Sequence, residues 1–358
     1  MGFTRIPDEL LARATPQERK AYTAALKRHI ALSSPMDFAL AIRPEAEDYP
    51  HTRYISDAIT EIPDWGGLII IMGPRQGKSY LCSEATPSWA LSRDPNARVL
   101  HATYGHDFMA SKIAPVVHGL IRQNQPITPP MHPKRRAITD FMIDPKVGNG
   151  FYFGTGVDGP MTGMPADWLI LDDLIKNATD AKSQVLRDNV WRWYVQVAEQ
   201  RLEPKGKTIV VGTPWHEDDI LSRLIANYKD DPRWRIIHLP SIAEEDDPLG
   251  RAPGEALCPD RFPLEELERK RKLDPIGFAA MHQGRPTPAD GDVFKEHNLV
   301  LYARERLPER GMKFGILDTA HSLKRTADYT VLTLFLASAP PNPKLYVTHM
   351  FRDKVESG

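Results

Sequence analysis

The sequence predicts an α/β fold, with a central, mostly parallel sheet flanked by helices and followed by a few antiparallel strands. Unbroken apolar runs at 68–72, 167–173 and 208–213 are typical of parallel strands, which bury both faces. A helical segment after the first run, followed by a strand at 98–103, makes a βαβ unit. Three strand-like runs joined by short turns after residue 311 predict an antiparallel meander.

The composition is that of a soluble globular protein, with 41% hydrophobic and 26% charged residues among 358. The net charge of −1 gives no global basic field, so any contact with nucleic acid must be local. Two distant cysteines, Cys82 and Cys258, exclude a disulfide scaffold or a zinc ribbon. No apolar run approaches 18 residues and no signal peptide opens the chain, so we expect a cytoplasmic protein without a membrane segment.

The remaining elements follow from apolar periodicity and from the placement of proline and glycine. The predicted helices lie at 8–33, 51–61, 106–124, 180–201, 216–228 and 263–273. Further strands are predicted at 151–153 and 234–239. A proline-rich loop at 126–133 and a flexible glycine-rich loop at 154–163 separate them, and the aromatic stripe of 191–194 is interpreted as core.

The first apolar strand runs into Gly73-Pro74-Arg75-Gln76-Gly77-Lys78-Ser79, which is built like a phosphate-binding loop. In such a loop, backbone N–H groups face the phosphates, a lysine adds a point charge and a hydroxyl coordinates Mg²⁺. The spacing is irregular, because the usual pattern G-x-x-x-x-G-K-[ST] would place its first glycine at position 72. The alternative is a strand–turn–helix junction with a chance Gly-Lys-Ser.

The second strand ends in adjacent carboxylates, Asp172 and Asp173. Ligands of parallel sheets bind beyond the carboxyl ends of the strands, where one carboxylate can hold Mg²⁺ and the next can orient or deprotonate a water. The alternative is a solvated turn or a helix N-cap. The third strand ends at Thr213, whose hydroxyl can sense a γ-phosphate. The alternative, which is compatible with that role, is that Thr213 caps a helix that begins near His216.

Two local basic runs, 132–136 and 269–272, are candidates for DNA contact, although each is more readily interpreted as a solvated face. In the C-terminal meander, Asp318 ends the first strand and Asp328 lies across the following turn. Paired acids of this kind are a plausible site for hard divalent cations. The alternative is two surface aspartates at strand ends.

In this order and spacing, the motifs resemble the large terminase subunit of tailed bacteriophages and prophages, the motor-nuclease that packages viral DNA into an empty capsid. The resemblance covers roughly residues 40–355. It is carried by Gly73–Ser79, by Leu169–Asp173 with the following Ala181-Lys182-Ser183, by Gly212–Asp219, and by Leu317–Ala320 with Thr326–Thr330.

The resemblance implies an ATPase that uses ATP and Mg²⁺. Arg75, Lys78 and Ser79 would hold the phosphates, Asp172 would bind Mg²⁺, Asp173 would stand where the family often has a catalytic Glu, and Thr213 would couple hydrolysis to DNA movement. The implied partners are double-stranded DNA, the small terminase subunit, the portal protein and further copies in a ring. The host cytoplasm is the implied location.

The resemblance also implies a division of the chain into a helical region (1–50), a P-loop ATPase domain (51–283), a linker (284–310) and part of an RNase H-like nuclease domain (311–358). Asp318 and Asp328 match the first acids of that nuclease, which would bind Mg²⁺ or Mn²⁺ if its site were completed. The family places further acids on later elements, and this sequence ends at Gly358. We therefore expect a fragment or a degenerate nuclease that does not cut DNA. A helicase-like ATPase and an inactive prophage remnant are the alternatives.

Overall fold

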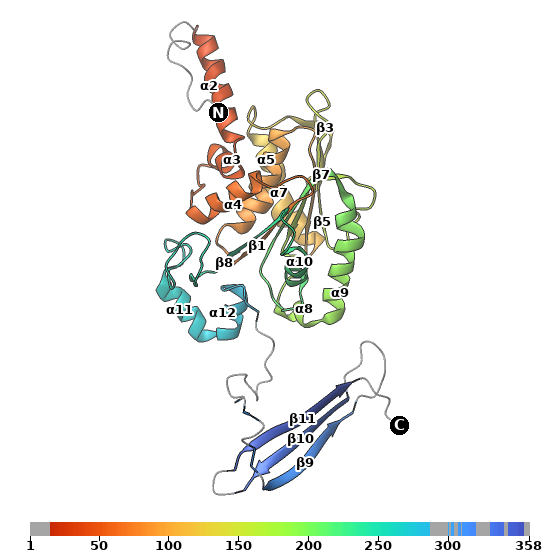
Figure 1. Cartoon of the computed structure of the whole chain (residues 1–358). Helices are drawn as coiled ribbons and strands as arrows, with labels where there is room; N and C mark the ends of the chain where they lie inside the picture. Colours follow the sequence, from red (N-terminus) through yellow and green to blue (C-terminus); the bar gives the residue numbers. More distant parts are fainter. Residues whose placement is uncertain are drawn as a thin grey trace. The chain divides into compact units, whose positions relative to one another are not determined.

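The computed structural model divides the chain into two compact units, residues 1–288 and 289–358. It describes residues 15–286, 300, 302–303, 307–308, 310–319, 330–339 and 343–353. Each unit is built around its own sheet, of eight strands in the first and three in the second (Figure 1). The expected α/β class, a sheet flanked by helices with a separate antiparallel sheet, is confirmed.

The strand order of the large sheet is β3-β4-β5-β2-β6-β7-β1-β8. The six strands from β5 to β8 are parallel, and β4 and β3 continue the sheet in antiparallel pairing. The strands are β1 Gly67–Met72, β2 Arg98–Thr103, β3 Met131–Arg136, β4 Asp140–Ile143, β5 Phe151–Gly156, β6 Ala166–Asp172, β7 Leu202–Gly212 and β8 Trp234–Leu239.

The register aligns the carboxyl ends of the three central strands. Ile71 of β1 pairs with Gly212 of β7, and Asp172 of β6 pairs with Val211 of β7. Residues that follow these strands in sequence therefore meet at one edge of the sheet.

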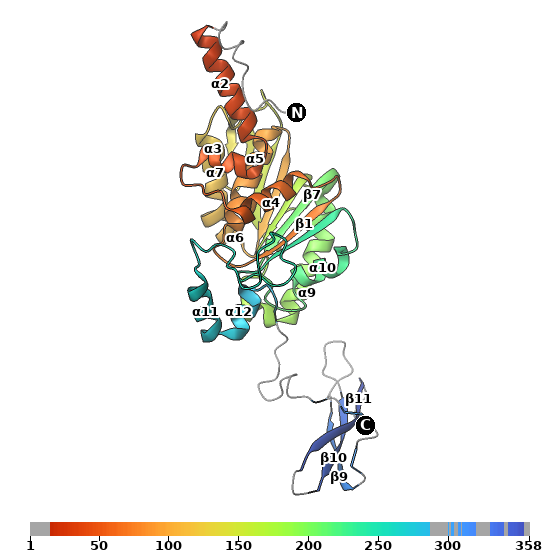
Figure 2. The ribbon, with the colours of Figure 1, turned by 60° about the vertical axis from the view of Figure 1, so that its left-hand side comes forward.

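Side chains of β1 alternate between two hydrophobic cores, one on each face of the sheet, because successive strand residues point to opposite faces. Leu68 and Ile70 belong to the core that contains residues of α3, α4, α5 and α7. Ile69 belongs to the core that contains residues of α9 and α10. Figure 2 shows these two groups of helices on opposite sides of the sheet. A strand that is buried along its whole length explains why the run at 68–72 has no polar alternation.

The helical elements of the first unit, with their bounds, are α2 Pro16–Ala31, α3 Pro35–Ile42, α4 Pro50–Thr60, η1 Tyr80–Ala85, α5 Thr86–Arg93, α6 His106–Phe108, η2 Met109–Ile113, α7 Ala114–Gln123, α8 Ala178–Lys182, α9 Gln184–Trp193, η3 Tyr194–Ala198, η4 Glu199–Arg201, α10 Ile220–Tyr228, α11 Leu264–Leu273 and α12 Pro275–Met281. Of these, η1, η2 and η3 are π-helical and η4 is a 3₁₀ turn. Among the described residues, no helix has the length and apolarity needed to span a bilayer.

Several predicted boundaries are wrong for local reasons. The helix predicted at 180–201 is interrupted at Ser183, whose hydroxyl accepts the N–H of Leu186 and caps α9. The helix predicted from 216 starts at Ile220. Helix α2 starts after Thr15 in a capping box with Glu18, and positions 8–14 of the predicted helix lie outside the described residues.

Two predicted loops contain strands. The proline-rich loop ends in β3, and β4 follows it as a hairpin partner. The predicted glycine-rich loop begins inside β5, where Gly154 and Gly156 are strand residues. A side chain at Gly156 would lie 2.4 Å from the backbone nitrogen of His106, so this strand needs glycine because α6 approaches it closely.

The second unit is an antiparallel meander with strand order β11-β10-β9, which confirms that prediction. Its strands are β9 Gly311–Asp318, β10 Thr330–Ser338 and β11 Leu345–Asp353. Phe314 and Phe335 stack across β9 and β10 with their rings 5.2 Å apart, and Leu336 is buried. Most other described side chains of this sheet are exposed or half-buried.

Candidate nucleotide site at the carboxyl edge of the sheet

The loop from Gly73 to Ser79 turns through two left-handed residues. Arg75 has φ 60° and Gly77 has φ 94°. A Cβ at Gly77 would also lie 3.2 Å from the methyl group of Thr52 on α4. The left-handed conformation therefore favours glycine at this position, and a Cβ there would also be tight against Thr52. Ser79 has helical dihedral angles and leads directly into η1, so the loop closes onto a helical N-terminus as predicted.

Buried polar contacts hold the loop from both sides. On one side, the His51 ring donates from Nε2 to the carbonyl oxygen of Gln76 (2.8 Å). On the other, the Gln76 amide donates to the hydroxyl of Ser241 (2.6 Å), which lies 3.1 Å from Nδ1 of His282. A Cβ at Gly73 would lie 2.7 Å from that hydroxyl. The glycine that breaks the usual spacing is therefore the residue that lets Ser241 reach the loop.

The central contact of the site is made by Lys78, whose side chain is only 6% exposed. Its Nζ donates to Oδ1 of Asp173 and to Oγ1 of Thr213, both at 2.9 Å. These residues follow three different strands, β1, β6 and β7, and the sheet register brings them together. Each of the three was predicted from the sequence as a site residue.

Asp173 lies just beyond β6 in the left-handed region, with φ 44°. Its N–H donates to the carbonyl of Val211 on β7, and its Oδ1 accepts the N–H of Thr213 (3.1 Å). A Cβ at Gly212 would lie 3.2 Å from Oδ1, so glycine there lets the carboxylate come close to β7. A non-glycine residue with this φ costs free energy, and such strain is concentrated at functional sites.

Asp172 is buried at the end of β6 and accepts a hydrogen bond from the Ser83 hydroxyl on Oδ2 (2.6 Å). Within the described part of the chain, its other oxygen, Oδ1, has no hydrogen-bond partner. Burial and then the charge of Asp173 raise the pKa of Asp172 to about 6, against the opposing effects of Lys78, Ser83 and Ser79. A buried carboxylate oxygen without a partner, close to a serine hydroxyl, fits a hard cation such as Mg²⁺.

Two of the predicted site residues lie differently from Lys78. The Arg75 side chain is exposed, and no described residue forms an ion pair or side-chain hydrogen bond with it. Ser79 is half-buried on the first helical turn after the loop. Ser83, one helical turn after Ser79, was missed. Its serine-to-serine spacing of four residues is the signal that could have found it.

The segment from Thr213 to Asp219 is fixed by Asp219, not by Thr213. Asp219 caps α10 by accepting the N–H of Ser222, and its Oδ2 also accepts the N–H groups of Trp215 and His216. The interpretation of Thr213 as the helix cap is therefore wrong. Asp219 remains the cap although burial raises its pKa.

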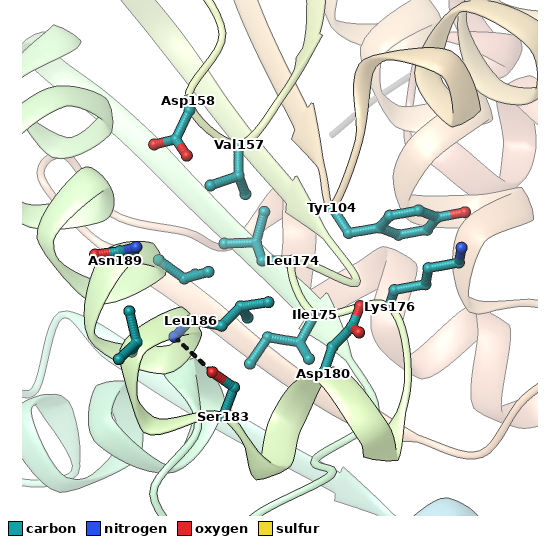
Figure 3. Close-up of a pocket in the computed structure, with 12 residues that line it drawn as sticks. Tyr104, Val157, Asp158, Leu174, Ile175, Lys176, Asp180, Ser183, Leu186 and Asn189 are labelled. Carbon is teal, nitrogen blue, oxygen red and sulfur yellow. Dashed lines mark hydrogen bonds between the residues drawn. The ribbon is translucent and has the colours of Figure 1, made fainter.

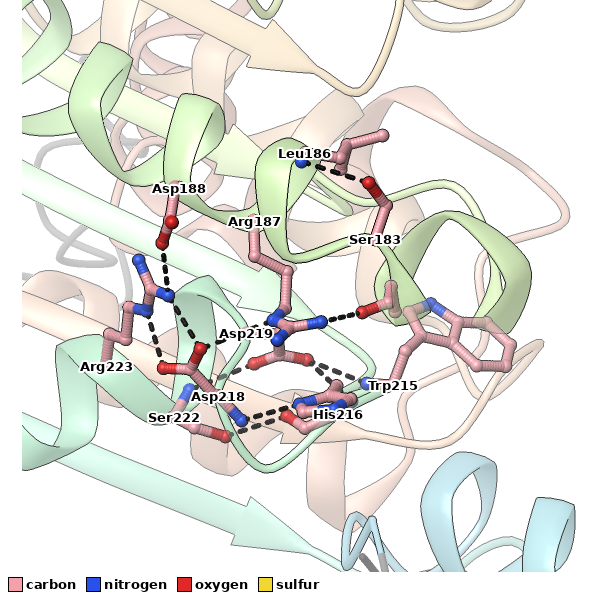
Figure 4. A network of polar contacts seen from close by, with 11 residues as sticks. Ser183, Leu186, Arg187, Asp188, Trp215, His216, Asp218, Asp219, Ser222 and Arg223 are labelled. Atoms are coloured by element: carbon pink, nitrogen blue, oxygen red, sulfur yellow. Dashed lines mark hydrogen bonds and ion pairs between the residues drawn. The ribbon is translucent and has the colours of Figure 1, made fainter. Parts of the chain in front are cut away.

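Arginines join this segment to α9, as Figure 4 shows. Arg223 donates to both oxygens of Asp218 and to Asp188 of α9. Buried Arg187 donates to the Ala181 carbonyl (2.5 Å) and lies 3.4 Å from Asp218. Hydrogen bonds from Arg223, then from Arg187, lower the pKa of Asp218. No local pattern in the sequence indicates this network, because its partners lie on separate elements.

A cavity of about 330 Å³ lies next to the site, beyond the carboxyl ends of β2, β5 and β6 (Figure 3). Its walls include Leu174, which directly follows Asp173, and the polar side chains of Asp158, Asp180 and Asn189. The Lys176 ammonium lies 5.9 Å from the centre of the Tyr104 ring at the cavity wall. None of the predicted nucleotide-site residues lines this cavity.

The predicted second site is only partly described. Asp318 ends β9 and is exposed, whereas Asp328 lies outside the described residues. Within the described ranges, no group of three or more His, Cys, Asp or Glu side chains is arranged to hold a metal ion. The predicted pairing of Asp318 with Asp328 thus stays a prediction.

The fold and the loop define a P-loop NTPase of the α/β class. The family model for the terminase large subunit, T4likevirus-type, N-terminal, matches residues 69–301, more than half of the chain. The chain therefore belongs to the large terminase subunit family. Among curated proteins, no relative matches the sequence.

Solved structures give more distant similarities. The large terminase of a thermophilic bacteriophage is 12% identical, with a TM-score of 0.43 over 92% of this chain and 68% of that one. A structure of the same phage protein in complex with ATP-gamma-S gives a TM-score of 0.39 at 12% identity, over 92% and 67% of the two chains. The ATPase domain of the Thermus phage P74-26 large terminase is 14% identical, with a TM-score of 0.38 over 62% and 88%.

Proposed function

We propose that this chain is the ATP-hydrolysing subunit of a motor that moves double-stranded viral DNA into a procapsid. The observation that carries this proposal is the buried contact of Lys78 with both Asp173 and Thr213. It joins the loop lysine, an acid and a hydroxyl at the edge of the sheet where parallel α/β folds bind ligands. Membership of the large terminase family supplies the DNA-packaging context.

In this proposal, the loop backbone and Lys78 hold the β- and γ-phosphates of ATP. The exposed Arg75 side chain would contact the phosphates from the solvent side of the loop. Ser79 and Asp172 would hold Mg²⁺, with Asp172 using the oxygen that has no partner among the described residues. Bound there, Mg²⁺ would neutralise the charge that develops on the phosphate oxygens.

Asp173 is proposed to orient or deprotonate the attacking water. Its Oδ1 already accepts from Lys78 and from the N–H of Thr213, and no described residue bonds its Oδ2. The side chain is about one third exposed (34%), so Oδ2 can face a water at the site. One oxygen fixes the side chain while the other is free for chemistry.

Thr213 is proposed to report the state of the phosphates to the rest of the domain. Its hydroxyl bonds Lys78, and its chain continues into the segment that Asp218 and Asp219 tie to α9 and α10. A shift of Lys78 toward a γ-phosphate would change the partner of the Thr213 hydroxyl. The hydrogen-bonded segment would then pass that change to the helices that it contacts.

The second unit is proposed as part of an RNase H-like nuclease domain, in which Asp318 and Asp328 bind Mg²⁺ or Mn²⁺. Two-metal phosphodiester cleavage places its ions about 3.5–4 Å apart, and two carboxylates give little charge to hold both. We therefore expect Asp318 and Asp328 alone not to support the cutting of plasmid DNA in Mn²⁺. Cutting that is lost in Asp318→Ala would contradict this expectation.

The motor proposal is tested by phosphate release from ATP with and without long linear duplex DNA. A DNA motor hydrolyses ATP faster when its track is present, so we expect stimulation by the duplex. A single-stranded oligonucleotide of equal nucleotide concentration is the control. A rate of ATP hydrolysis that the duplex does not change would contradict translocation. Displacement of an annealed strand would favour a helicase.

The remaining assignments are the small terminase subunit, the portal protein, a homo-oligomeric ring and the host cytoplasm. They rest on the family and not on any contact described in the chain. They form the rest of the proposal, because a packaging motor must recognise its DNA and dock on the capsid. Co-purification of this chain with a portal protein would test the docking directly.

A further inference from the structure

The two basic runs of the sequence differ in how their charges are compensated. On α11, Arg269 pairs with Glu266 (2.9 Å) and Arg271 pairs with Glu268 (2.7 Å). The ammonium of Lys270 lies 4.6 Å from the centre of the Phe262 ring. This run is a self-compensated helix surface, as its pattern of alternating acids and bases indicates.

The run on β3 is not compensated in this way. Lys134, Arg135 and Arg136 are exposed, and the one ion pair that they make with a described residue joins Arg135 to Asp140 at 3.7 Å. Arg122 of α7 is also exposed. Burial lowers the pKa of His118, and the positive charges of Arg122 and Arg136 lower it further.

These cations are presented by a locally fixed backbone. The pairing of β3 with β4 shifts between Met131 and Arg136, which leaves a bulge that carries the run. His132 accepts the N–H groups of both Lys134 and Arg135 on Nδ1 (3.0 Å each), and His118 donates from Nε2 to the carbonyl of Arg136 (3.2 Å).

The hairpin of β3 and β4 is itself fixed to the sheet. The N–H of Gly154 on β5 donates to the carbonyl of Thr139, which lies between the two hairpin strands (2.8 Å). A single Lys or Pro is enough to protect an edge strand from pairing with another chain. The run on β3 has three adjacent cations next to Arg122, and among the described residues they form an ion pair only with Asp140. This is more positive charge than the protection of an edge strand needs. The positive potential of such a cluster attracts a polyanion.

We infer that the basic cluster formed by Arg122, Lys134, Arg135 and Arg136 is a surface that binds the phosphate backbone of double-stranded DNA. Arginine and lysine bind phosphates without reading the bases, so the contact is independent of DNA sequence. The inference rests on the proposed motor function for its choice of polyanion. It adds the place on the first unit at which the duplex makes contact.

The test measures binding of the full chain to a fluorescently labelled duplex of about 30 base pairs over a series of salt concentrations. The double variant Lys134→Gln/Arg136→Gln removes two charges from the cluster. The matched control, Lys270→Gln/Lys272→Gln, removes two charges from α11. We expect the β3 variant to bind about tenfold more weakly, and its slope of log affinity against log salt to fall by about 2. The control should stay within about twofold of the parent.

An equal loss of duplex affinity in both variants, or no loss in either, would overturn the inference, because the affinity would then not depend on the cluster. Competition by polyglutamate as strong as that by duplex DNA would assign the cluster to acidic proteins instead. ATP hydrolysis without DNA is measured on the same samples and should match the parent, since neither variant touches the nucleotide site. A parent that binds the duplex and hydrolyses ATP, with no loss of affinity in the β3 variant, would overturn this inference alone. A parent that hydrolyses ATP but does not bind the duplex would also contradict the proposed movement of DNA, and a parent that does not hydrolyse ATP would contradict the proposed ATPase.

Discussion

At the scale of single residues, Asp172 and Asp173 are adjacent in the chain but lie in different surroundings. Asp172 is buried against the Ser83 hydroxyl, with its other oxygen unpartnered among the described residues. Asp173 turns back toward β7 through a left-handed backbone and bonds Lys78. One carboxylate is therefore placed for a cation and the other for a water.

This difference predicts separate phenotypes for the two aspartates. Asp173→Asn keeps an oxygen that can accept from Lys78 and Thr213, so ATP and Mg²⁺ should still bind while hydrolysis slows by about 10²–10⁴-fold through loss of the base. Asp172→Asn loses the charge that fits Mg²⁺ and should shift the Mg²⁺ dependence itself. Fluorescent-nucleotide binding and Mg²⁺ titrations of turnover measure both. The same binding defect in both variants would show that the division of roles is wrong.

Thr213→Val should uncouple hydrolysis from DNA. The substitution keeps the shape and the N–H bond to Asp173 but removes the hydroxyl that accepts from Lys78. We expect near-normal nucleotide affinity with little stimulation of turnover by duplex DNA. Thr208→Val is the matched control, because Thr208 is buried on β7, the strand that Thr213 follows, and its hydroxyl has no hydrogen-bond partner among the described residues. Stimulation that survives in Thr213→Val would remove Thr213 from the coupling mechanism.

Single residues could be predicted from the sequence where a polar motif directly follows an apolar strand. Lys78, Asp173 and Thr213 were each predicted from the end of a strand, and the structure brings them into direct contact. The different surroundings of Asp172 and Asp173 could not be predicted, because they depend on Ser83 and on the backbone turn toward β7.

At the scale of elements, long apolar strands were predicted well and polar strands were not. β1, β2, β6 and β8 lie where their apolar runs predict them, whereas β3 carries four basic side chains and was interpreted as a loop. Helix ends depend on single caps such as Ser183 and Asp219, which cannot be told from other polar residues without the fold. The anchor of the phosphate loop on Ser241 joins residues 165 positions apart and has no local signature.

That anchor predicts a positioning role for Ser241. Ser241→Ala leaves the buried Gln76 amide without its acceptor, at a cost of about 1–3 kcal/mol. We expect weaker ATP binding and faster hydrogen exchange over 73–79, with a smaller change in the maximal rate. Ser92→Ala is the control, since Ser92 is equally buried but its hydroxyl donates to a carbonyl of its own helix. Identical exchange over 73–79 in the parent and Ser241→Ala would contradict the anchor.

At the scale of the whole molecule, the order of the apolar runs in the sequence predicts both the mostly parallel sheet and the separate meander. It could not predict that β7 lies between β1 and β6, since strand order depends on contacts between distant segments. It also could not show that His101 is enclosed at the centre of the sheet. There its Nδ1 faces the Tyr152 hydroxyl at 3.1 Å, and its Nε2 has no described partner.

This enclosure predicts an acid-dependent loss of stability. Burial lowers the pKa of His101 to about 3, whereas the unfolded chain takes up the proton near pH 6.5. The contribution of the buried, neutral His101 to the free energy of unfolding is therefore complete above about pH 6.5. It is lost as the pH falls toward 3, at about 1.4 kcal/mol per pH unit. Between pH 7 and pH 5, the free energy of unfolding measured in urea should fall by about 2 kcal/mol less in His101→Phe than in the parent. Tyr152→Phe keeps the histidine and should keep the parent's slope. An unchanged slope in His101→Phe would contradict the prediction.

ATP hydrolysis by Lys78→Ala beside Lys176→Ala tests the proposed phosphate-binding site most directly. Both variants remove one lysine at the carboxyl edge of the sheet, but only Lys78 bonds Asp173 and Thr213, while Lys176 lies against Tyr104 at the neighbouring cavity. We expect Lys78→Ala to abolish hydrolysis and to weaken nucleotide binding, because the charge beside the phosphates is lost. We expect Lys176→Ala to hydrolyse ATP like the parent. A Lys78→Ala protein that turns over ATP at the parent's rate would contradict the phosphate-binding site and the motor built on it.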